Sequence, residues 1–484
     1  MNRFTVCRDM FVKTLGISTK RVNTALKKSR VLDLKDNRGK HQHHKRLSEM
    51  KKEEVKAHIN KIPRYKSHYR RTQTDREYLP TDMTLEKMYN LYKSENNSPV
   101  SFSYYRRIFY TEFNITRKPL KKDTCNKCDT FSAKSAASNI VSDVENFNQQ
   151  HYEHLEAAEK ARKQMKEDFN EAKSNQLVET ITFDLEKTLP MPKIPTNIIF
   201  YKRQIWLYNL GIHTATTNKV HCFIWPEGVA GRGSQEVGSC LKKFIDLYLG
   251  PEIKEIRFWC DSCGGQNRNI KICLLLKHAL HNHRTLNKIT INFLESGHSF
   301  LPNDADFSDI EKAIKFQQRL YGPEDYANVM RSCRKKNAIT VNTMTTNDFL
   351  SSSTLEKMIV NRKTDIIGQK VNWLLVRKIK IEKERPFSLF FKFSHNDDEQ
   401  FTEVDLKPKV KGKPQLSLTT DLELSWPTGK PMSTPKLNDI KSIMHLIPEN
   451  EQNFFTSLLA NDAIIDDVDG YDGDVDFEFE TESE

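Results

Sequence analysis

Between residues 178 and 294 the chain alternates β-rich runs with helical stretches, and this alternation constrains its fold more than any other feature. Runs rich in β-branched and aromatic residues occur at 178–185, 197–201, 204–212, 220–225, 253–261 and 288–294. Helices are expected at 234–249 and 269–281. Because an initial β-meander is followed by strands that alternate with helices, the sequence predicts an α/β fold with a mixed sheet flanked by helices.

Two of the predicted strands end in an aspartate that is followed by a turn. Asp184 lies near the end of the run at 178–185, and Asp261 ends the run at 253–261. When two strands are neighbours in a sheet, such end positions can bring their carboxylates close together. A first strand with an acidic residue, a β-meander and a later strand with a second acidic residue follow the order of a ribonuclease-H-like core. We therefore expect such a core between residues 178 and 365.

A third group of acidic residues lies between 297 and 311, where the sequence predicts a helix with Asn303 as its N-cap. Asp304 and Glu311 are seven residues apart and fall near one face of this helix, whereas Asp306 points elsewhere. The apolar residues expected on the packed face are Phe307, Ile310 and Ile314. Asp304 is the expected third carboxylate, and Asp306 and Glu311 remain alternatives for that position.

Three carboxylates that converge from two strands and a helix suit two Mg²⁺ or Mn²⁺ ions. Two such ions about 4 Å apart activate a water or a 3′-hydroxyl and stabilise the leaving oxygen of a phosphodiester. The sequence therefore predicts that Asp184, Asp261 and Asp304 are catalytic metal ligands, with Glu311 as an additional candidate ligand. Because the chain contains 64 acidic residues, spacing alone does not select this triad, and the residues around it must be considered as well.

A second kind of metal site is predicted from the spacing of cysteines and histidines. The nine cysteines are an odd number, which does not fit a disulfide framework and indicates a reducing compartment. Cys125 and Cys128 form a C-x2-C turn, which is half of a tetrahedral zinc site; two free thiols in a loop are the alternative. His151 and His154, at the start of a long charged helix, would complete the site. Their spacing is about one residue short of the usual range, so His154 with an unidentified fourth ligand is equally compatible.

Charge is distributed unevenly along the chain. Residues 1–72 hold 21 Lys or Arg against six Asp or Glu, and residues 462–484 hold eleven Asp or Glu and no basic residue. The basic N-terminal part and a net charge of +12 predict a polyanionic partner, most often nucleic acid; a solvated charged surface is the alternative. The acidic C-terminal part is expected to be disordered, and either to bind a basic partner or to act as a solubilising tail.

The first 30 residues predict two short helices around a glycine-containing break, with Ser18 or Thr19 as the cap of the second helix. This helix-turn-helix-like pattern is typical of DNA-binding elements, although any two-helix hairpin with a charged face has the same pattern. The residues that it would present to DNA are Lys20, Arg21, Asn23 and Lys27.

Further along, the segments 65–71 and 104–107 interleave aromatic and basic residues, as nucleic-acid-binding surfaces do. Arg70 and Arg71 are therefore additional candidates for DNA contacts. The chain has no run of 18 apolar residues, so neither a transmembrane helix nor a membrane partner is expected.

These features divide the chain into five expected parts. They are a basic helix-turn-helix-like region (1–72), a helical region with the zinc half-site (73–177), a ribonuclease-H-like catalytic core (178–365), a β-rich and then helical piece (366–460) and a disordered acidic tail (461–484).

Short motifs around the predicted carboxylates resemble those of a known family. Residues 261–269, D-S-C-G-G-Q-N-R-N, match the signature D-x-C-x-G-Q-N-x-N, and residues 297–304, G-H-S-F-L-P-N-D, match G-H-[ST]-x4-D. Three further segments look similar: 183–190, 123–129 together with His154, and 7–17. In this order the motifs resemble a large group of transposase-derived proteins of animal genomes, over most of the chain. These are DDE-type proteins with a ribonuclease-H-like core.

The resemblance implies roles for individual residues. The three implied metal ligands are Asp184, Asp261 and Asp304. His298 is implied as a catalytic residue that bonds a ligand carboxylate or the scissile phosphate; a buried histidine that bonds backbone groups is the alternative. Gln266 and Asn267 are implied to orient a phosphate or a water, after a tight turn at Gly264 and Gly265.

The leading hypothesis is therefore a nuclear DDE-type DNA transposase, or a domesticated derivative, with an additional cytoplasmic location as the alternative. It would bind DNA through its basic and zinc-bearing regions and would cut and join strands with Mg²⁺ or Mn²⁺; a homodimer is compatible with this activity. A non-catalytic DNA-binding protein derived from a transposase and a nuclease without strand transfer are the alternatives. Since the chain starts within the apparent DNA-binding segment, an upstream portion is expected in an intact element.

Overall fold

The structure is a computed structural model of the 484-residue chain. It describes residues 5–31, 49–66, 77–80, 83–117, 125–138, 140–359, 363–407, 416–459 and 463–464. The chain divides into two compact units, Met1–Lys122 and Asp123–Glu484, and each is described by itself. From the sequence we expect boundaries after residues 72, 177, 365 and 460. Arg70, Arg71 and nearly all of the acidic tail lie outside the described residues.

The first unit is helical and includes one small sheet. Its helices are α1 (Arg8–Thr14), α2 (Thr19–Arg30), α3 (Glu49–Lys61), α4 (Leu85–Glu95) and α5 (Phe102–Glu112), and its strands are β1 (Tyr65–Lys66), β2 (Glu77–Leu79) and β3 (Ile115–Arg117). The expected pair of N-terminal helices is present. The Ser18 hydroxyl caps α2, since its oxygen accepts a hydrogen bond from the Arg21 N–H at 3.3 Å.

A core forms between α3, α4 and α5, and it corrects one expectation. Tyr92 and Tyr105 are fully buried with their ring centroids 5.3 Å apart, and His58 Nδ1 lies 3.0 Å from the Tyr105 hydroxyl. The run 104–107, expected to be a nucleic-acid surface, lies within α5. Tyr105 belongs to the core because residues three or four apart on a helix share a face, and Tyr105, Ile108 and Phe109 form that buried face.

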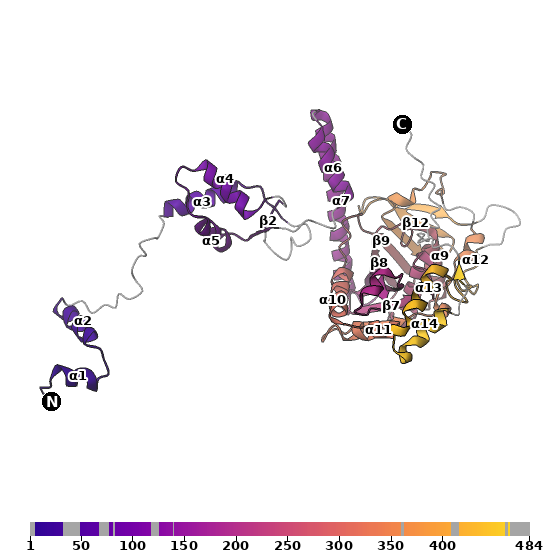
Figure 1. Cartoon of the computed structure of the whole chain (residues 1–484). Coiled ribbons are helices and arrows are strands. Elements are labelled where there is room, and N and C mark those ends of the chain that lie inside the picture. The colour runs from indigo at the N-terminus through magenta and orange to yellow at the C-terminus, as the bar shows by residue number, and fades with distance from the viewer. Residues whose placement is uncertain are drawn as a thin grey trace. The chain divides into compact units, whose positions relative to one another are not determined.

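The second unit is built on a ten-stranded mixed sheet with the order β10-β7-β6-β4-β8-β9-β11-β12-β13, in which β5 also pairs with β6 (Figure 1). The strands are β4 (Val178–Leu185), β5 (Leu189–Met191), β6 (Ile205–Thr214), β7 (Val220–Pro226), β8 (Glu255–Cys260), β9 (Lys288–Phe293), β10 (Thr340–Thr343), β11 (Lys378–Glu382), β12 (Ser388–Lys392) and β13 (Thr402–Asp405). β4, β6 and β7 are antiparallel neighbours, whereas β4, β8 and β9 are parallel. The predicted α/β fold with a mixed sheet flanked by helices is confirmed.

Helices pack on both faces of this sheet. The helices of the second unit are α6 (Asn126–Ala137), α7 (Val141–Ser174), α8 (Ser234–Tyr248), α9 (Ile270–Asn282), α10 (Pro302–Phe316), α11 (Pro323–Ser332), α12 (Ser353–Lys357), α13 (Thr434–Ile443) and α14 (Gln452–Leu459). Residues of β6 enter two different cores: Leu210 joins the core with α8 and α9, and Leu207 joins the core with α10, α11, α13 and α14. The sheet therefore separates two apolar layers.

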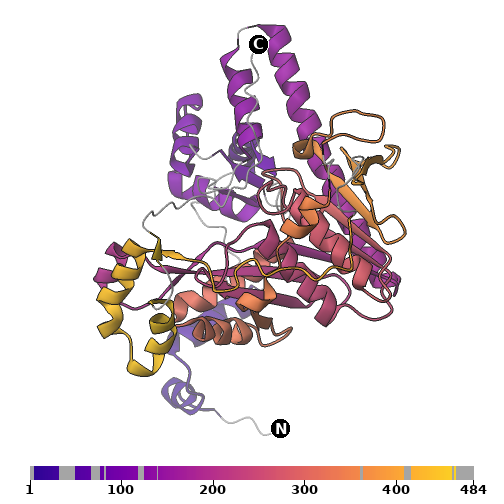
Figure 2. The same ribbon diagram turned by 90° about the vertical axis from the view of Figure 1, so that its right-hand side faces the viewer.

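The long helix α7 joins α6 to the sheet. The two helices form a hairpin that extends beyond the sheet, at the top of Figure 2. Near its other end α7 packs on β4 and β8, where the Asp168 carboxylate accepts a hydrogen bond from the Trp259 indole of β8 at 2.8 Å. Trp259 and Ala161 of α7 share a small apolar cluster with Leu294 and Leu301. This cluster lies beside the loop that connects β9 to α10.

Two expectations about secondary structure are corrected. Residues Asn197–Tyr201 form a 3-10 helix, η1, rather than a strand. A five-residue run that follows Pro195 and Thr196 is too short for its periodicity to distinguish the two forms. The β-rich segment that the sequence places in a separate C-terminal piece extends the main sheet, because β11 pairs with the free edge of β9. At the C-terminus, β15 (Ala463–Ile464) pairs with β14 (Met432–Ser433).

Candidate metal centres

Two of the predicted carboxylates lie side by side because their strands are parallel neighbours. In the register of β4 and β8, Thr182 pairs with Trp259. Two residues further along, Asp184 and Asp261 lie at the carboxyl ends of the two strands, on the same face of the sheet. One oxygen of Asp184, Oδ1, accepts a hydrogen bond from the Leu185 N–H at 2.8 Å. The two carboxylates thus approach each other as the sequence predicts.

The third carboxylate comes from the first turn of α10, which lies across β6 and β4. The Asn303 amide donates a hydrogen bond to the Gly211 carbonyl at 2.8 Å. A Cβ on Gly211 would be 2.6 Å from the Phe307 ring, so only glycine allows this close approach of helix and strand. Asn303 is therefore not the N-cap: α10 begins at Pro302 and its N-cap is Leu301, whose N–H donates to Asp304 Oδ2 at 3.2 Å.

The charges of Asp261 and Asp304 both act on Asp184. Burial, together with the charges of Asp261 and Asp304, raises the pKa of Asp184 to about 7. Burial also raises the pKa of Asp261, against hydrogen bonds from the Cys263 N–H and the Asn267 side chain. Carboxylates that lie close together in a partly buried site disfavour each other's ionisation unless a cation is bound between them. Carboxylate oxygens are the ligands that hard divalent ions such as Mg²⁺ and Mn²⁺ prefer, but the oxygens of these three residues do not all lie within 4.8 Å of one another.

The two alternatives for the third carboxylate have other partners. Asp306 is buried between His213, whose Nδ1 lies 2.8 Å from Oδ2, and Arg334, whose Nη2 lies 2.7 Å from Oδ1. Glu311 lies about two helical turns after Asp304 on α10. Its carboxylate pairs with Lys187 at 2.7 Å, and its side chain is 37% exposed. Of the three candidates on α10, Asp304 is the one whose charge acts on Asp184.

The loop after β8 holds Asp261 in place. The Asn267 amide donates to Asp261 Oδ1, and the Cys263 N–H donates to the same oxygen at 3.3 Å. Asn269 caps α9, since its Oδ1 accepts from the Lys271 N–H at 3.0 Å. The motif residue Asn267, implied by the resemblance to orient a phosphate or a water, therefore bonds the carboxylate itself. No pattern in the sequence separates these two roles of an asparagine.

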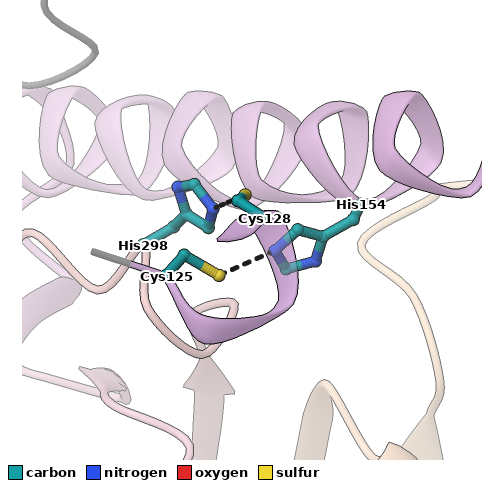
Figure 3. Close-up of side chains that lie close together, drawn as sticks. All are labelled: Cys125, Cys128, His154 and His298. Atoms are coloured by element: carbon teal, nitrogen blue, oxygen red, sulfur yellow. Dashed lines mark hydrogen bonds between the residues drawn. The ribbon is translucent and has the colours of Figure 1, made fainter. Parts of the chain in front are cut away.

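A second cluster of metal-ligand atoms forms from cysteines and histidines. Cys125, Cys128, His154 and His298 each offer one atom, and these four atoms lie within 4.8 Å of one another. Cys125 Sγ is 3.2 Å from His154 Nε2, and Cys128 Sγ is 3.3 Å from His298 Nε2 (Figure 3). In the part of the chain that the structure describes, this is the one group of three or more such residues that meets the distance. A Cys2His2 set of this size could hold a metal such as zinc.

The elements that supply these ligands are far apart in the sequence. Cys125 immediately precedes α6 and Cys128 lies in its first turn, so one helical turn presents both thiols. His154 projects from α7, and His298 projects from the loop between β9 and α10 (Figure 3). Glycine at 297, with φ +77°, allows this contact, because a Cβ there would lie 2.7 Å from Cys125 Cβ.

Two predicted roles are corrected by this cluster. His151 is not part of it; its ring lies 6.0 Å from that of Phe131 instead. His298, expected at the carboxylates, belongs to the cysteine cluster. On a helix, positions three apart lie at different heights and angles, and here only His154 faces the cysteines. Spacing does not reveal the fourth ligand, because it lies 144 residues beyond His154.

Charged residues that the sequence did not single out support the histidines. Glu295 Oε2 lies 3.9 Å from His154 Nδ1, and Arg377 pairs with the same carboxylate at 2.5 and 3.0 Å. Burial lowers the pKa of His154, which favours the neutral imidazole that a metal requires. At 3.9 Å the Glu295 carboxylate lies near His154 Nδ1 but beyond hydrogen-bond distance.

The predicted DNA-contact residues of the first unit lie on α2. None of the residues of α1 and α2 is buried, so Lys20, Arg21 and Lys27 are not part of a core. Asn23 accepts a hydrogen bond from Arg8 of α1, which joins the two helices.

Comparison of the chain with protein-family models, with curated proteins and with solved structures finds no match. Among the described residues, no helix combines the length and the apolar composition that crossing a bilayer requires.

Proposed function

We propose that the chain is a DDE-type, transposase-derived enzyme that cuts and joins DNA phosphodiester bonds with two divalent metal ions. The observation that carries the proposal is that Asp184 is buried beside Asp261 and Asp304, so that burial and the charges of these two residues raise its pKa to about 7. The family motifs that run through these residues agree with it.

The connectivity of the sheet supports a ribonuclease-H-like core. The strands β4, β6 and β7 form an antiparallel meander, and the following strands β8 and β9 add in parallel on the other side of β4. The order β7-β6-β4-β8-β9, with α8, α9 and α10 after the third, fourth and fifth strands, is the order expected for such a core. The three carboxylates come from the first strand, the fourth strand and the last helix of this series.

The chemistry assigned to the carboxylates follows from their hydrogen bonds. Asp184 and Asp261 each use Oδ1 to accept bonds from the protein, and within the described residues neither Oδ2 has a hydrogen-bond partner. These two oxygens are available to hold cations, and Asn267 keeps the Asp261 carboxylate from rotating. When bound, the metal ions would activate the attacking water or hydroxyl and stabilise the leaving oxygen.

DNA is the proposed substrate. The basic residues of α2 and the excess of Lys and Arg among residues 1–72 support a polyanionic partner. Binding through phosphate contacts would weaken steeply as the salt concentration rises.

The experiment that tests the proposal is Mn²⁺ binding by calorimetry, on the full chain, with zinc held constant and with and without DNA. Asp261→Asn should lose Mn²⁺ binding and Mn²⁺-dependent cleavage of DNA while it retains DNA affinity. Asp246→Asn, at an exposed pair with Lys242 on α8, is the matched control and should bind and cleave as the wild type does.

Each other outcome would support a different function for this chain. Equal cleavage by Asp261→Asn would refute the catalytic assignment. A wild-type chain that binds DNA but no Mn²⁺, even with DNA present, would be a non-catalytic binding protein. Cleavage without joining in a strand-transfer assay would identify a nuclease.

A further inference from the structure

One loop connects the two candidate metal centres. Residues 294–301 connect β9 to α10, and this loop supplies His298 to the Cys2His2 cluster six residues before Asp304. The loop turns tightly at this point: the His298 N–H donates to the Glu295 carbonyl at 2.9 Å, and the Phe300 N–H donates to the His298 carbonyl at 3.1 Å. Few residues therefore separate the cysteine cluster from the third carboxylate.

The middle of this loop packs against the cysteine turn. Gly297 lies against Cys125, as described above, and Cys125 Sγ is 3.4 Å from the Ser296 carbonyl oxygen. Leu294 and Leu301, at the two ends of the loop, are buried against Trp259, whereas residues 296–300 are not buried. A metal bound through His298 would therefore fix the part of the loop that apolar packing does not fix.

The end of the loop sets the position of the Asp304 carboxylate. The Leu301 N–H donates to Asp304 Oδ2, and the Asp304 N–H donates to the Leu301 carbonyl at 3.1 Å. The helix α10 has its own contacts: Asn303, also in the first turn, donates to Gly211, and Asp306 bonds His213 and Arg334. Loosening the loop would thus act on Asp304 through its hydrogen bonds with Leu301 and change the orientation of this carboxylate, while the helix itself stays in place.

We propose that zinc in the Cys2His2 centre fixes the 294–301 loop and thereby positions Asp304, so that the carboxylates bind their divalent ions tightly only when zinc is present. His298 is then a positioning residue, which acts through zinc and the loop without contacting the reacting groups. The consequence for Mn²⁺ rests on the proposed function; the consequence for the loop does not.

The test compares variants of the full chain for zinc content, for hydrogen–deuterium exchange of residues 294–304 and for Mn²⁺ affinity. His298→Ala should exchange at least tenfold faster in this segment and bind Mn²⁺ about tenfold more weakly. His298→Cys supplies a thiolate as the fourth ligand and should restore zinc content, protection and Mn²⁺ affinity together. His151→Ala, which removes a histidine of α7 outside the cluster, should match the wild type in all three measurements.

Two results would overturn the proposal. One is zinc loss in His298→Ala with unchanged exchange of residues 294–304. The other is a His298→Cys variant that holds zinc and yet exchanges and binds Mn²⁺ as His298→Ala does, which would mean that the imidazole acts at the carboxylates directly. If the zinc-loaded wild type binds no Mn²⁺, the proposed function fails, and the exchange data alone decide whether zinc fixes the loop.

Discussion

Replacing Asp184 with asparagine should stabilise the protein when Mg²⁺ and Mn²⁺ are absent, and this outcome tests the raised pKa of Asp184 without an enzymatic assay. Burial and the charges of Asp261 and Asp304 raise the pKa of Asp184 from 3.8 to about 7. The folded state therefore holds a proton that the unfolded state has released. Between about pH 4 and pH 7 the contribution of this group to stability falls as the pH rises.

The size of the effect follows from the pKa. At 1.36 kcal/mol per pKa unit, the ionised Asp184 destabilises the folded state by about 4 kcal/mol. Solvent and relaxation around a side chain that is not fully buried reduce this value. We expect Asp184→Asn to be about 1–3 kcal/mol more stable than the wild type at pH 8, and to keep less than half of this advantage at pH 5.

Thermal unfolding at pH 5 and pH 8, with zinc present and no other divalent ion, measures this difference. The control Asp246→Asn should show no gain that depends on pH. Added Mn²⁺ should raise the melting temperature of the wild type and leave that of Asp184→Asn unchanged, because only a binding-competent site is stabilised by its ligand. If Asp184→Asn has the same effect on stability at both pH values, the pKa of Asp184 is not raised in the folded protein and the reasoning is refuted.

Three further changes test the packing of the two centres and the binding of DNA. Gly211→Ala should destabilise the second unit by about 1–3 kcal/mol and weaken Mn²⁺ binding, because a Cβ would meet the Phe307 ring; unchanged melting and Mn²⁺ titration curves would contradict the close packing of α10 on β6. Gly297→Ala should release zinc faster to a chelator, because residue 297 has a φ of +77° and the added Cβ would clash with Cys125. Equal release rates for the variant and the wild type would contradict this contact. Alanine in place of the basic residues of α2 should weaken DNA binding and lower the salt slope by about one for each phosphate that is no longer neutralised. Anisotropy titrations at several salt concentrations measure this slope, and an unchanged slope would exclude α2 from the interface.

The parts of the site that the sequence predicts are those that local patterns determine. A strand of alternating apolar residues ends at Asp184, a second ends at Asp261, and the apolar spacing of α10 defines the face on which Phe307 and Ile310 pack. Each of these features needs only a window of about ten residues to be recognised. The sheet therefore has the predicted class, and the carboxylates have the predicted placement at its strand ends.

The parts that the sequence does not predict depend on contacts between distant segments. The pairing of β11 with β9 joins the C-terminal strands to the main sheet, and no local pattern encodes the partner of an edge strand. The fourth ligand of the cysteine cluster also comes from a distant segment that local patterns do not predict. His151 has the nearer position in the sequence, but His298 is brought to Cys128 by the β9–α10 loop. The histidine in a G-H-S motif next to a predicted carboxylate is the available signal, and it indicates the wrong centre.

The contact of α7 with the sheet has a practical consequence for experiments that divide the chain. A fragment cut at residue 178 would keep the whole main sheet and all three carboxylates. It would also lack Asp168, which bonds the Trp259 indole, and it would uncover the face of that tryptophan that α7 buries. His298 would be left without any of its three companion ligands. A truncation series should therefore yield soluble, metal-binding protein only when the fragment begins ahead of Cys125, and a piece designed around the carboxylates alone should aggregate.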